Sequence, residues 1–209
     1  MNPTTAATVG DVHSRDNPYS SRFVRPGAAA FLYDDGATAE SLVDRFLALG
    51  GCGAVVGPHG SGKSTLLSEL QCELRRRGYD VAAFELHDDA RGWSGFGPRA
   101  WGPRTVVTID GFEQLSTWRR RFVRWRLKFA GALLLATMHD AGAWPVIYRT
   151  RPSREKAMHI ARRLSALHAS AEDADRIAPD EVERLFDAHQ GNVREVLFRL
   201  YDLYELRRR

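Results

Sequence analysis

The stretch that decides the fold is Gly57-Pro58-His59-Gly60-Ser61-Gly62-Lys63-Ser64-Thr65. A glycine, four residues and then Gly-Lys-Ser is the spacing of a loop that holds phosphate groups. The apolar run 54–56 before this loop predicts a short buried strand, and leucines at helical spacing predict a helix over 65–77 behind it. Strand, loop and helix in this order place backbone N–H groups and a helix N-terminus around a phosphate.

Each residue type in the loop has a chemical reason. Gly57, Gly60 and Gly62 let the backbone curl around the phosphates. Lys63 has the length to reach the β- and γ-phosphates, and the Ser64 hydroxyl is a ligand for Mg²⁺. We therefore expect the loop to bind a nucleoside triphosphate, with ATP as the first choice and Mg²⁺ as its ion. The alternative is a glycine-rich turn with an incidental lysine.

The composition is that of an ordinary globular chain. Its 209 residues suffice for one α/β domain and a small addition, and 44% of them are hydrophobic. The net charge of +4 allows a polyanionic partner without requiring one. Cys52 and Cys72 match no metal-ligand spacing, the N-terminus lacks the apolar core of a signal peptide, and no apolar run reaches the length of a membrane span. We expect a cytoplasmic protein that has no membrane partner.

The second informative stretch is Thr105–Asp110, a β-branched run that ends in a carboxylate. A buried strand that delivers an aspartate beside the phosphate loop fits a Walker B site, in which Asp110 holds Mg²⁺ through its water shell. Glu113 follows three residues later and is the candidate to orient or deprotonate the attacking water. The alternatives are a solvated strand end for Asp110 and a surface carboxylate for Glu113.

Apolar runs that alternate with helical patterns predict the fold class α/β. The runs are 54–56, 81–86, 105–110, 132–136 and 145–150. Because each run is almost continuously apolar, we expect a parallel sheet of about five strands in a three-layer αβα sandwich. Ligands of such sheets bind at the carboxyl ends of the strands, where Gly57, Asp110 and Thr137 lie.

The chain changes character towards both ends. Residues 1–21 are polar and without periodicity, which predicts a disordered tail. Residues 22–151 contain all the predicted strands and form the expected nucleotide-binding core. From 152 to 209 the pattern is helical only, which predicts a small all-helical C-terminal domain.

A strongly basic helix is predicted over 117–130. Its aromatic residues fall at helical spacing, which favours packing on the sheet, and they are Trp118, Phe122, Trp125 and Phe129. No acidic residue stands between Gln114 and His139, and the helix is rich in cations: Arg119, Arg120, Arg121, Arg124, Arg126 and Lys128. These cations either face solvent or bind nucleic acid or a neighbouring subunit's phosphates. If they bind nucleic acid, charge reversal at Arg120 and Arg124 weakens the binding.

With these motifs, the chain from Thr38 to Arg209 resembles the AAA+ ATPases, which belong to the ASCE division of P-loop NTPases. The resemblance implies that Thr137 is the residue called sensor 1, which helps to place the attacking water. It also implies that Gly191-Asn192-Val193-Arg194 belongs to a helical lid, whose Arg194, called sensor 2, reaches the γ-phosphate. ATP hydrolysis, motion of the lid against the core, remodelling of a partner and assembly into a homo-oligomer are further implications.

Two departures from the family pattern concern the core. Gly111, rather than a glutamate, follows Asp110, so hydrolysis depends on Glu113. The helix that the family has between the second and third strands is replaced by 88–103, a stretch rich in glycine and tryptophan. Its aromatic side chains either fill the edge of the core or stack on a partner.

A third departure concerns assembly. No arginine lies between His139 and Val146, where a neighbouring subunit's arginine finger is usually sought, and Arg149 and Arg151 are the nearest substitutes. These departures leave two other functions open. One is a nucleotide-dependent switch that binds ATP with negligible turnover, and the other is a P-loop kinase that phosphorylates a small acceptor. The Gly-Asn-x-Arg element counts against the kinase.

Overall fold

The computed structural model describes residues 17–34, 36–86, 101–169 and 176–208. Most of the predicted loop 88–103 lies outside these ranges. The contacts of the chain divide it into two compact units. The larger unit is Arg25–Pro152, and the smaller one joins the described part of Met1–Val24 to that of Ser153–Arg209. Each unit has a hydrophobic core of its own.

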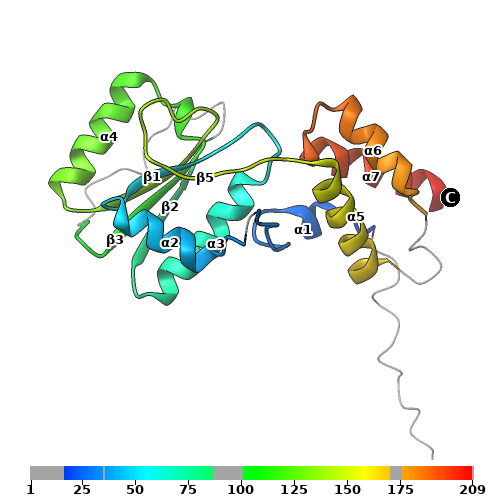
Figure 1. The fold of residues 1–209 in the computed structure, drawn as a ribbon, viewed down its shortest axis with the longest axis horizontal. Coiled ribbons are helices and arrows are strands. Elements are labelled where there is room, and N and C mark those ends of the chain that lie inside the picture. The colour runs from blue at the N-terminus through cyan, green and yellow to red at the C-terminus, as the bar shows by residue number, and fades with distance from the viewer. Residues whose placement is uncertain (1–16, 35, 87–100, 170–175, 209) are drawn as a thin grey trace, which may run out of the picture. The chain divides into compact units, whose positions relative to one another are not determined.

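A five-stranded parallel sheet is the centre of the larger unit (Figure 1). The strands are β1 (Cys52–Val56), β2 (Asp80–Glu85), β3 (Thr105–Asp110), β4 (Leu133–Met138) and β5 (Val146–Arg149). Their order is β2-β3-β4-β1-β5, and every neighbouring pair is parallel. The three central strands are almost entirely buried because helices cover both of their faces, which explains their continuous apolar runs.

Helices lie on both faces of this sheet, so the predicted three-layer αβα sandwich is confirmed (Figure 1). On one face, α2 (Ala39–Ala48) and α3 (Lys63–Arg76) pack through a cluster that includes Phe46. On the other face, α4 (Thr117–Phe129) packs beside the short 3-10 helix η2 (Phe112–Gln114). The two clusters together bury the sheet and hold its strand ends in place.

The orientation of α4 differs from the sequence prediction. The prediction that its aromatic residues pack on the sheet is wrong, because Val123 and Leu127 are the buried residues of this helix. The exposed residues are Trp118, Phe122, Trp125 and Phe129. Phe112 and Leu115, from the turn before α4, already fill the sheet face beside it. A narrow aliphatic ridge is therefore all that the helix contributes to the core.

The smaller unit is helical, as predicted for the C-terminal part of the chain. Its helices are α1 (Ser21–Val24), α5 (Arg154–His168), α6 (Pro179–Ala188) and α7 (Val193–Arg208). The Ser153 hydroxyl caps α5 by accepting the N–H of Lys156 at 3.2 Å. The Asn192 side chain accepts the N–H of Glu195 at 3.3 Å and so begins α7.

Residues 17–24 belong to this helical unit, which corrects the expected tail of 1–21 at its end. Tyr19 is 1% exposed, and its hydroxyl lies 2.8 Å from that of Ser165. Asn17 is buried as well. Burial raises the pKa of the Tyr19 phenol. Phe23 of the same segment packs against this core and stacks on the His168 ring, and composition does not reveal anchors of this kind.

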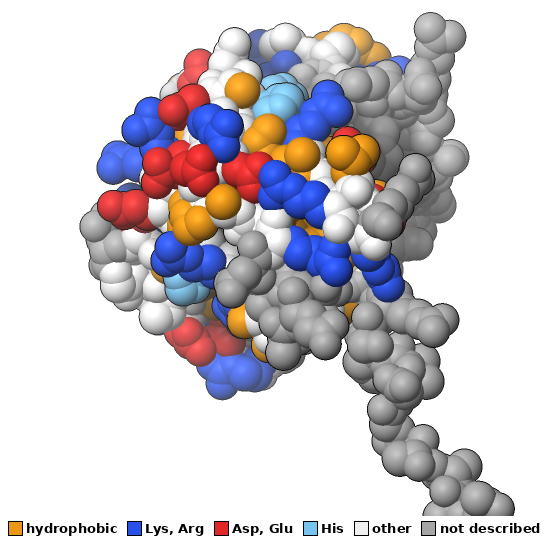
Figure 2. Space-filling view, turned by 90° about the vertical axis from the view of Figure 1, so that its right-hand side faces the viewer, with side chains coloured by type: hydrophobic (Ala, Val, Ile, Leu, Met, Phe, Trp, Pro, Cys, Tyr) orange, Lys and Arg blue, Asp and Glu red, His pale blue; other side chains and the backbone are white. Residues whose placement is uncertain are grey.

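Basic and acidic side chains are intermixed on the face of the molecule that Figure 2 shows. In the helical unit, basic and acidic side chains form ion pairs that join Arg154 to Asp187 at 2.8 Å and Arg207 to Glu181 at 2.5 Å. Exposed pairs like these contribute little to stability, so the unit depends on its apolar core. Within the described residues, no helix combines the length and the apolar character that crossing a membrane requires.

Candidate nucleotide-binding site

Three strands bring their carboxyl ends together at one edge of the sheet. In the register of the parallel pairs, Thr137 of β4 lies opposite Val55 of β1, and Ala136 lies opposite Ile109 of β3. The residues that follow are therefore neighbours: the glycine-rich loop after β1, and Asp110 at the end of β3. Ligands of parallel α/β sheets bind at this edge.

The loop between β1 and α3 has a backbone suited to phosphate. Gly60 and Gly62 have φ angles of 65° and 88°, which glycine adopts at little cost. Gly57 is required for a different reason, because a Cβ at this position would lie 2.0 Å from Thr150 Oγ1. α3 begins directly after Gly62, so its unpaired N–H groups and the positive end of its dipole belong to the loop.

Lys63 is 9% exposed, and the loop itself holds its ammonium group. Its Nζ donates to the carbonyl oxygens of Gly57 at 2.8 Å and Pro58 at 2.7 Å, and it lies 3.4 Å from His139 Nδ1. A buried ammonium group that is held among oxygen acceptors is already positioned to bind an anionic oxygen. Binding of a phosphate requires Nζ to exchange these carbonyls for phosphate oxygens.

Asp110 and Thr137, predicted to lie close together, are hydrogen-bonded to each other. The Thr137 hydroxyl donates to Asp110 Oδ1 and accepts the N–H of Gly111 at 2.9 Å. Thr137 is completely buried, whereas Asp110 is half-buried. The threonine therefore orients the carboxylate that the sequence assigns to Mg²⁺.

Gly111 explains why the second carboxylate comes three residues after Asp110. Its φ of 75° turns the chain from β3 into η2, and a Cβ at this position would meet the Leu86 carbonyl oxygen at 3.0 Å. The turn places Glu113 Oε1 3.0 Å from His139 Nε2. Glu113 Oε2 is buried and has no hydrogen-bond partner among the described residues.

His139 is the site residue that the sequence analysis missed. Its Nε2 faces Glu113, its Nδ1 lies 3.1 Å from the Gly57 carbonyl oxygen, and its ring lies 3.8 Å from that of His59. The contact of Nε2 with the Glu113 carboxylate is an ion pair when the imidazole is protonated. His139 thus connects the turn after β3 to the phosphate loop. The available signal was its position two residues after Thr137.

The available donors suit Mg²⁺, the ion implied by a triphosphate site. Ser64 supplies a hydroxyl from the first turn of α3, and Asp110 supplies a carboxylate from the end of β3. Oxygen ligands of this kind, completed by water and phosphate, are those that Mg²⁺ prefers. No group of three or more metal-binding side chains occurs in the part of the chain that the structure describes. The fit is therefore to an ion held jointly with a nucleotide.

An aromatic segment lies against the phosphate loop. The Phe31 N–H donates to Glu69 Oε1 at 2.5 Å, and the Tyr33 hydroxyl donates to Oε2 of the same residue. Burial, and then the neighbouring Glu69 carboxylate, raise the pKa of Tyr33 above its usual value. The Phe31 ring lies so near the loop that a Cβ on Gly62 would be 3.1 Å from it. α3 thus holds an aromatic wall beside the glycine-rich loop.

Comparison with known proteins now identifies the family. The family model described as AAA domain matches residues 28–198 of the chain. The protein belongs to the AAA domain family. The resemblance that the motifs predicted is confirmed, and a search of curated proteins finds no match.

The solved structures similar to this AAA domain include two proteins from Thermotoga maritima. Domain III of the replication initiation protein DnaA from Thermotoga maritima has a TM-score of 0.49 and 12% identity, and the match covers 83% of this chain and 95% of that one. A single-residue mutant of RuvB from Thermotoga maritima has a TM-score of 0.44 and 14% identity, with 79% of this chain and 66% of that one covered.

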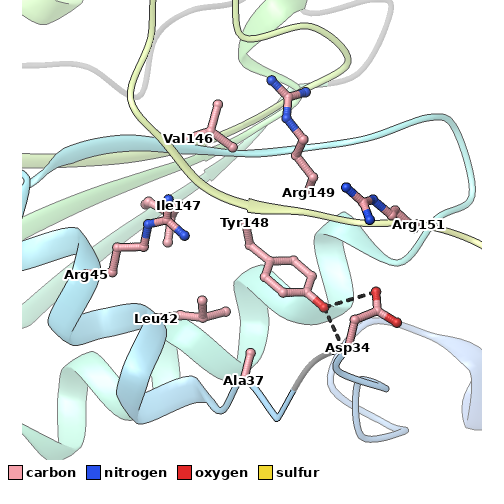
Figure 3. A pocket seen from close by; sticks show the side chains of 9 residues that line it. All are labelled: Asp34, Ala37, Leu42, Arg45, Val146, Ile147, Tyr148, Arg149 and Arg151. Carbon is pink, nitrogen blue, oxygen red and sulfur yellow. Dashed lines mark hydrogen bonds between the residues drawn. The ribbon is translucent and has the colours of Figure 1, made fainter.

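A shallow pocket of about 380 Å³ lies beside the edge strand β5 of the AAA domain (Figure 3). Arg45, Arg149 and Arg151 line it, and all three are exposed. The hydroxyl of Tyr148 accepts the N–H of Asp34 at 2.7 Å, which joins two of the residues that line the pocket (Figure 3). The two arginines predicted as substitutes for an arginine finger therefore share one surface of the larger unit.

Arg194 lies in the other unit of the AAA domain. It is exposed in the first turn of α7. Gln190 and Gly191 before it have φ angles of 52° and 81°, which make the tight turn between α6 and α7. The contact of Arg194 with a γ-phosphate stays a prediction.

Proposed function

We propose that this AAA domain binds ATP with Mg²⁺ and hydrolyses the ATP. The observation that carries this proposal is the support given to Glu113. His139 holds one carboxylate oxygen beside the phosphate loop, and the other oxygen is buried with no partner among the residues described. A carboxylate in this position suits removal of a proton from an attacking water molecule. A solvated surface glutamate would have no such support.

The remaining residues have separate tasks in this mechanism. The backbone of residues 57–65 holds the triphosphate, and Lys63 supplies the cation for its β- and γ-phosphates. Ser64 and Asp110 would hold Mg²⁺, and the bound ion would neutralise charge on the phosphate oxygens. Thr137 keeps the Asp110 carboxylate oriented through its hydrogen bond.

We further propose that neighbouring subunits of a homo-oligomer complete each site. Arg149 and Arg151 are exposed beside β5, which suits contact with a second copy. The family resemblance assigns a neighbour's arginine, together with Arg194 of the same chain, to the γ-phosphate. Hydrolysis then moves the helical unit against the core and acts on a partner.

The specific rate of ATP hydrolysis should rise with protein concentration, because a neighbour's arginine reaches the phosphate only in the oligomer. Steady-state phosphate release is measured over a range of protein concentrations, with Lys63→Ala as the inactive control. Arg149→Ala or Arg151→Ala is expected to keep the rate at that of dilute protein. Arg163→Ala, which removes an exposed arginine of α5, should leave the concentration dependence unchanged.

The alternative functions give different results in this assay. Tight ATP binding with turnover no higher than that of Lys63→Ala indicates a nucleotide-dependent switch. Phosphate that appears only on an added small acceptor indicates a kinase. A specific rate that is independent of protein concentration contradicts the completion of sites between subunits, but it does not contradict the proposed ATPase activity.

We place the protein in the cytoplasm, where ATP is present and free thiols such as Cys52 and Cys72 stay reduced.

Replacement of His139 tests whether this residue positions Glu113. His139→Ala should lower kcat about tenfold with little change in ATP affinity, because the carboxylate loses the polar contact with Nε2 that orients it. His139→Gln should recover part of the rate, since its amide group can restore a polar contact with the carboxylate. Both kcat and the Kd for ATP are measured. An equal loss of kcat in the two variants, or a loss confined to ATP affinity, contradicts the positioning role.

A further inference from the structure

The outer face of α4 carries four large aromatic side chains that the core does not use. Trp118 is 65% exposed, Phe122 48%, Trp125 64% and Phe129 86%. We call these four residues the aromatic stripe. The ring centroids of Phe122 and Trp125 are 6.2 Å apart, those of Trp125 and Phe129 are 6.0 Å apart, and the ring planes differ by 33° and 22°. The rings of Phe122, Trp125 and Phe129 thus form a nearly parallel row along the helix, and exposed apolar side chains grouped in this way mark interaction surfaces.

Basic side chains flank the aromatic stripe on both sides. Because successive residues turn about 100° around a helix, Arg121, Arg124 and Lys128 fall on one side of the stripe, and all three are exposed. Arg119 and Arg126 fall on the other side and are half-buried. No acidic residue occurs from 114 to 139, so nothing on this helix neutralises the positive charge.

Several of these arginines are already held in place by aromatic rings. The guanidinium of Arg124 lies 4.6 Å from the centre of the Trp144 ring, and that of Arg126 lies 5.3 Å from the centre of the Trp101 ring. Arg120 is different, because it donates to the carbonyl oxygen of Leu115 at 2.7 Å and points away from the stripe. Arg120 is therefore excluded from contact with a ligand on the aromatic stripe, whereas Arg124 remains a candidate for such a contact.

We propose that the outer face of α4 binds single-stranded nucleic acid, with bases on the aromatic stripe and phosphates on the flanking cations. Two properties of this face, its aromatic side chains and its positive charge, match single-stranded nucleic acid. The buried positions of α4 are aliphatic, Val123 and Leu127, while the large apolar side chains on its outer face are all aromatic, as suits a partner with flat rings. The positive charge, which no acidic residue of α4 itself offsets, suits a polyanion.

The same charge argues against a second copy of α4 as the occupant. Two such helices face to face would bring together two rows of arginines without a single acidic side chain between them. A duplex is also a poor occupant, because its bases are stacked and paired, so their faces are not open to the rings. The proposal is independent of ATP hydrolysis and would stand if the protein turned over no nucleotide.

The test measures binding of a fluorescein-labelled oligothymidylate by fluorescence anisotropy over a range of salt concentrations. Trp125→Ala/Phe129→Ala should weaken binding about tenfold for each ring removed. Arg121→Ala/Lys128→Ala should lower the slope of log K against log salt by about 1.4, because each phosphate contact on a single strand contributes about 0.7. All four positions are exposed, so the fold should be retained, and thermal unfolding of each variant checks this.

Matched controls come from the helical unit. Phe198→Ala removes an aromatic side chain that is 45% exposed, and Arg163→Ala removes an exposed cation. Neither change should alter the affinity. The expected order of affinity for wild-type protein is single strand above duplex of the same length.

Four results would overturn the proposal. The first is no binding at low salt. The second is affinity that the aromatic variant retains in full, which indicates charge attraction alone. The third is that the wild type binds no oligonucleotide but co-sediments with phosphatidylglycerol vesicles, and that Trp125→Ala/Phe129→Ala abolishes this co-sedimentation. This result assigns the face to a lipid surface. The fourth is a wild-type dimer that this variant converts to a monomer, which assigns the face to a second copy.

Discussion

Glu113→Gln is expected to slow ATP hydrolysis by about 10²- to 10⁴-fold and to leave ATP affinity almost unchanged. Glutamine keeps the size of the side chain, and its amide oxygen can keep the 3.0 Å contact that Glu113 Oε1 makes with His139 Nε2. It cannot accept a proton from water at neutral pH. Single-turnover hydrolysis gives the rate, and isothermal titration calorimetry gives the affinity for ATP.

The matched control for this variant is Glu183→Gln, which makes the same change at an exposed position of α6. Its hydrolysis rate should equal that of the wild type. If Glu113→Gln also hydrolyses ATP at the wild-type rate, Glu113 has no part in the mechanism, and the nucleotide-dependent switch becomes the better description of the protein.

Gly57→Ala should abolish ATP binding and lower the melting temperature by about 5 °C. The new Cβ would lie 2.0 Å from Thr150 Oγ1 and 2.8 Å from the Thr150 carbonyl oxygen, so the backbone after β5 must move. Overpacking of this kind costs about 1–3 kcal/mol, which corresponds to several degrees in a protein of this size. The movement also displaces Ser61, whose hydroxyl lies 2.6 Å from that of Thr150.

Thermal unfolding with and without ATP measures both effects, because a ligand that binds the folded state raises the melting temperature. The control is Gly102→Ala, since a Cβ on Gly102 meets no atom within 4 Å. It should unfold and respond to ATP like the wild type. An ATP-induced shift in Gly57→Ala as large as in the wild type would show that the loop tolerates the displacement.

The fold followed from local patterns to a large extent. The spacing of glycines and leucines predicted β1, the phosphate loop and α3, and the structure has them as Cys52–Val56 and Lys63–Arg76 around the loop. Ser153 and Asn192 cap α5 and α7 through N–H groups only three residues further along the chain, so these helix starts are local features as well. Such signals are readable because the atoms concerned lie within a few residues of one another along the chain.

The candidate site was predicted less completely. Asp110 and Thr137 were expected at one edge of the sheet, and their hydrogen bond places them there. His139 was missed because its partners, Glu113 and Gly57, are 26 and 82 residues away along the chain. A histidine after a strand has no local pattern that separates a positioning role from an ordinary surface position.

The sequence by itself determined what depends on neighbours along the chain: the strand, loop and helix around Lys63, the carboxylate that ends β3, and the caps of the helices. Only the tertiary structure decided what depends on neighbours in space, such as the burial of Tyr19 and the partner of Glu113. The clearest case is α4, which has an aliphatic ridge on one side and the aromatic stripe on another. Either of these apolar surfaces could pack against the sheet. Phe112 and Leu115 already occupy the sheet beside it, so the narrow ridge faces inwards and the aromatic stripe faces out.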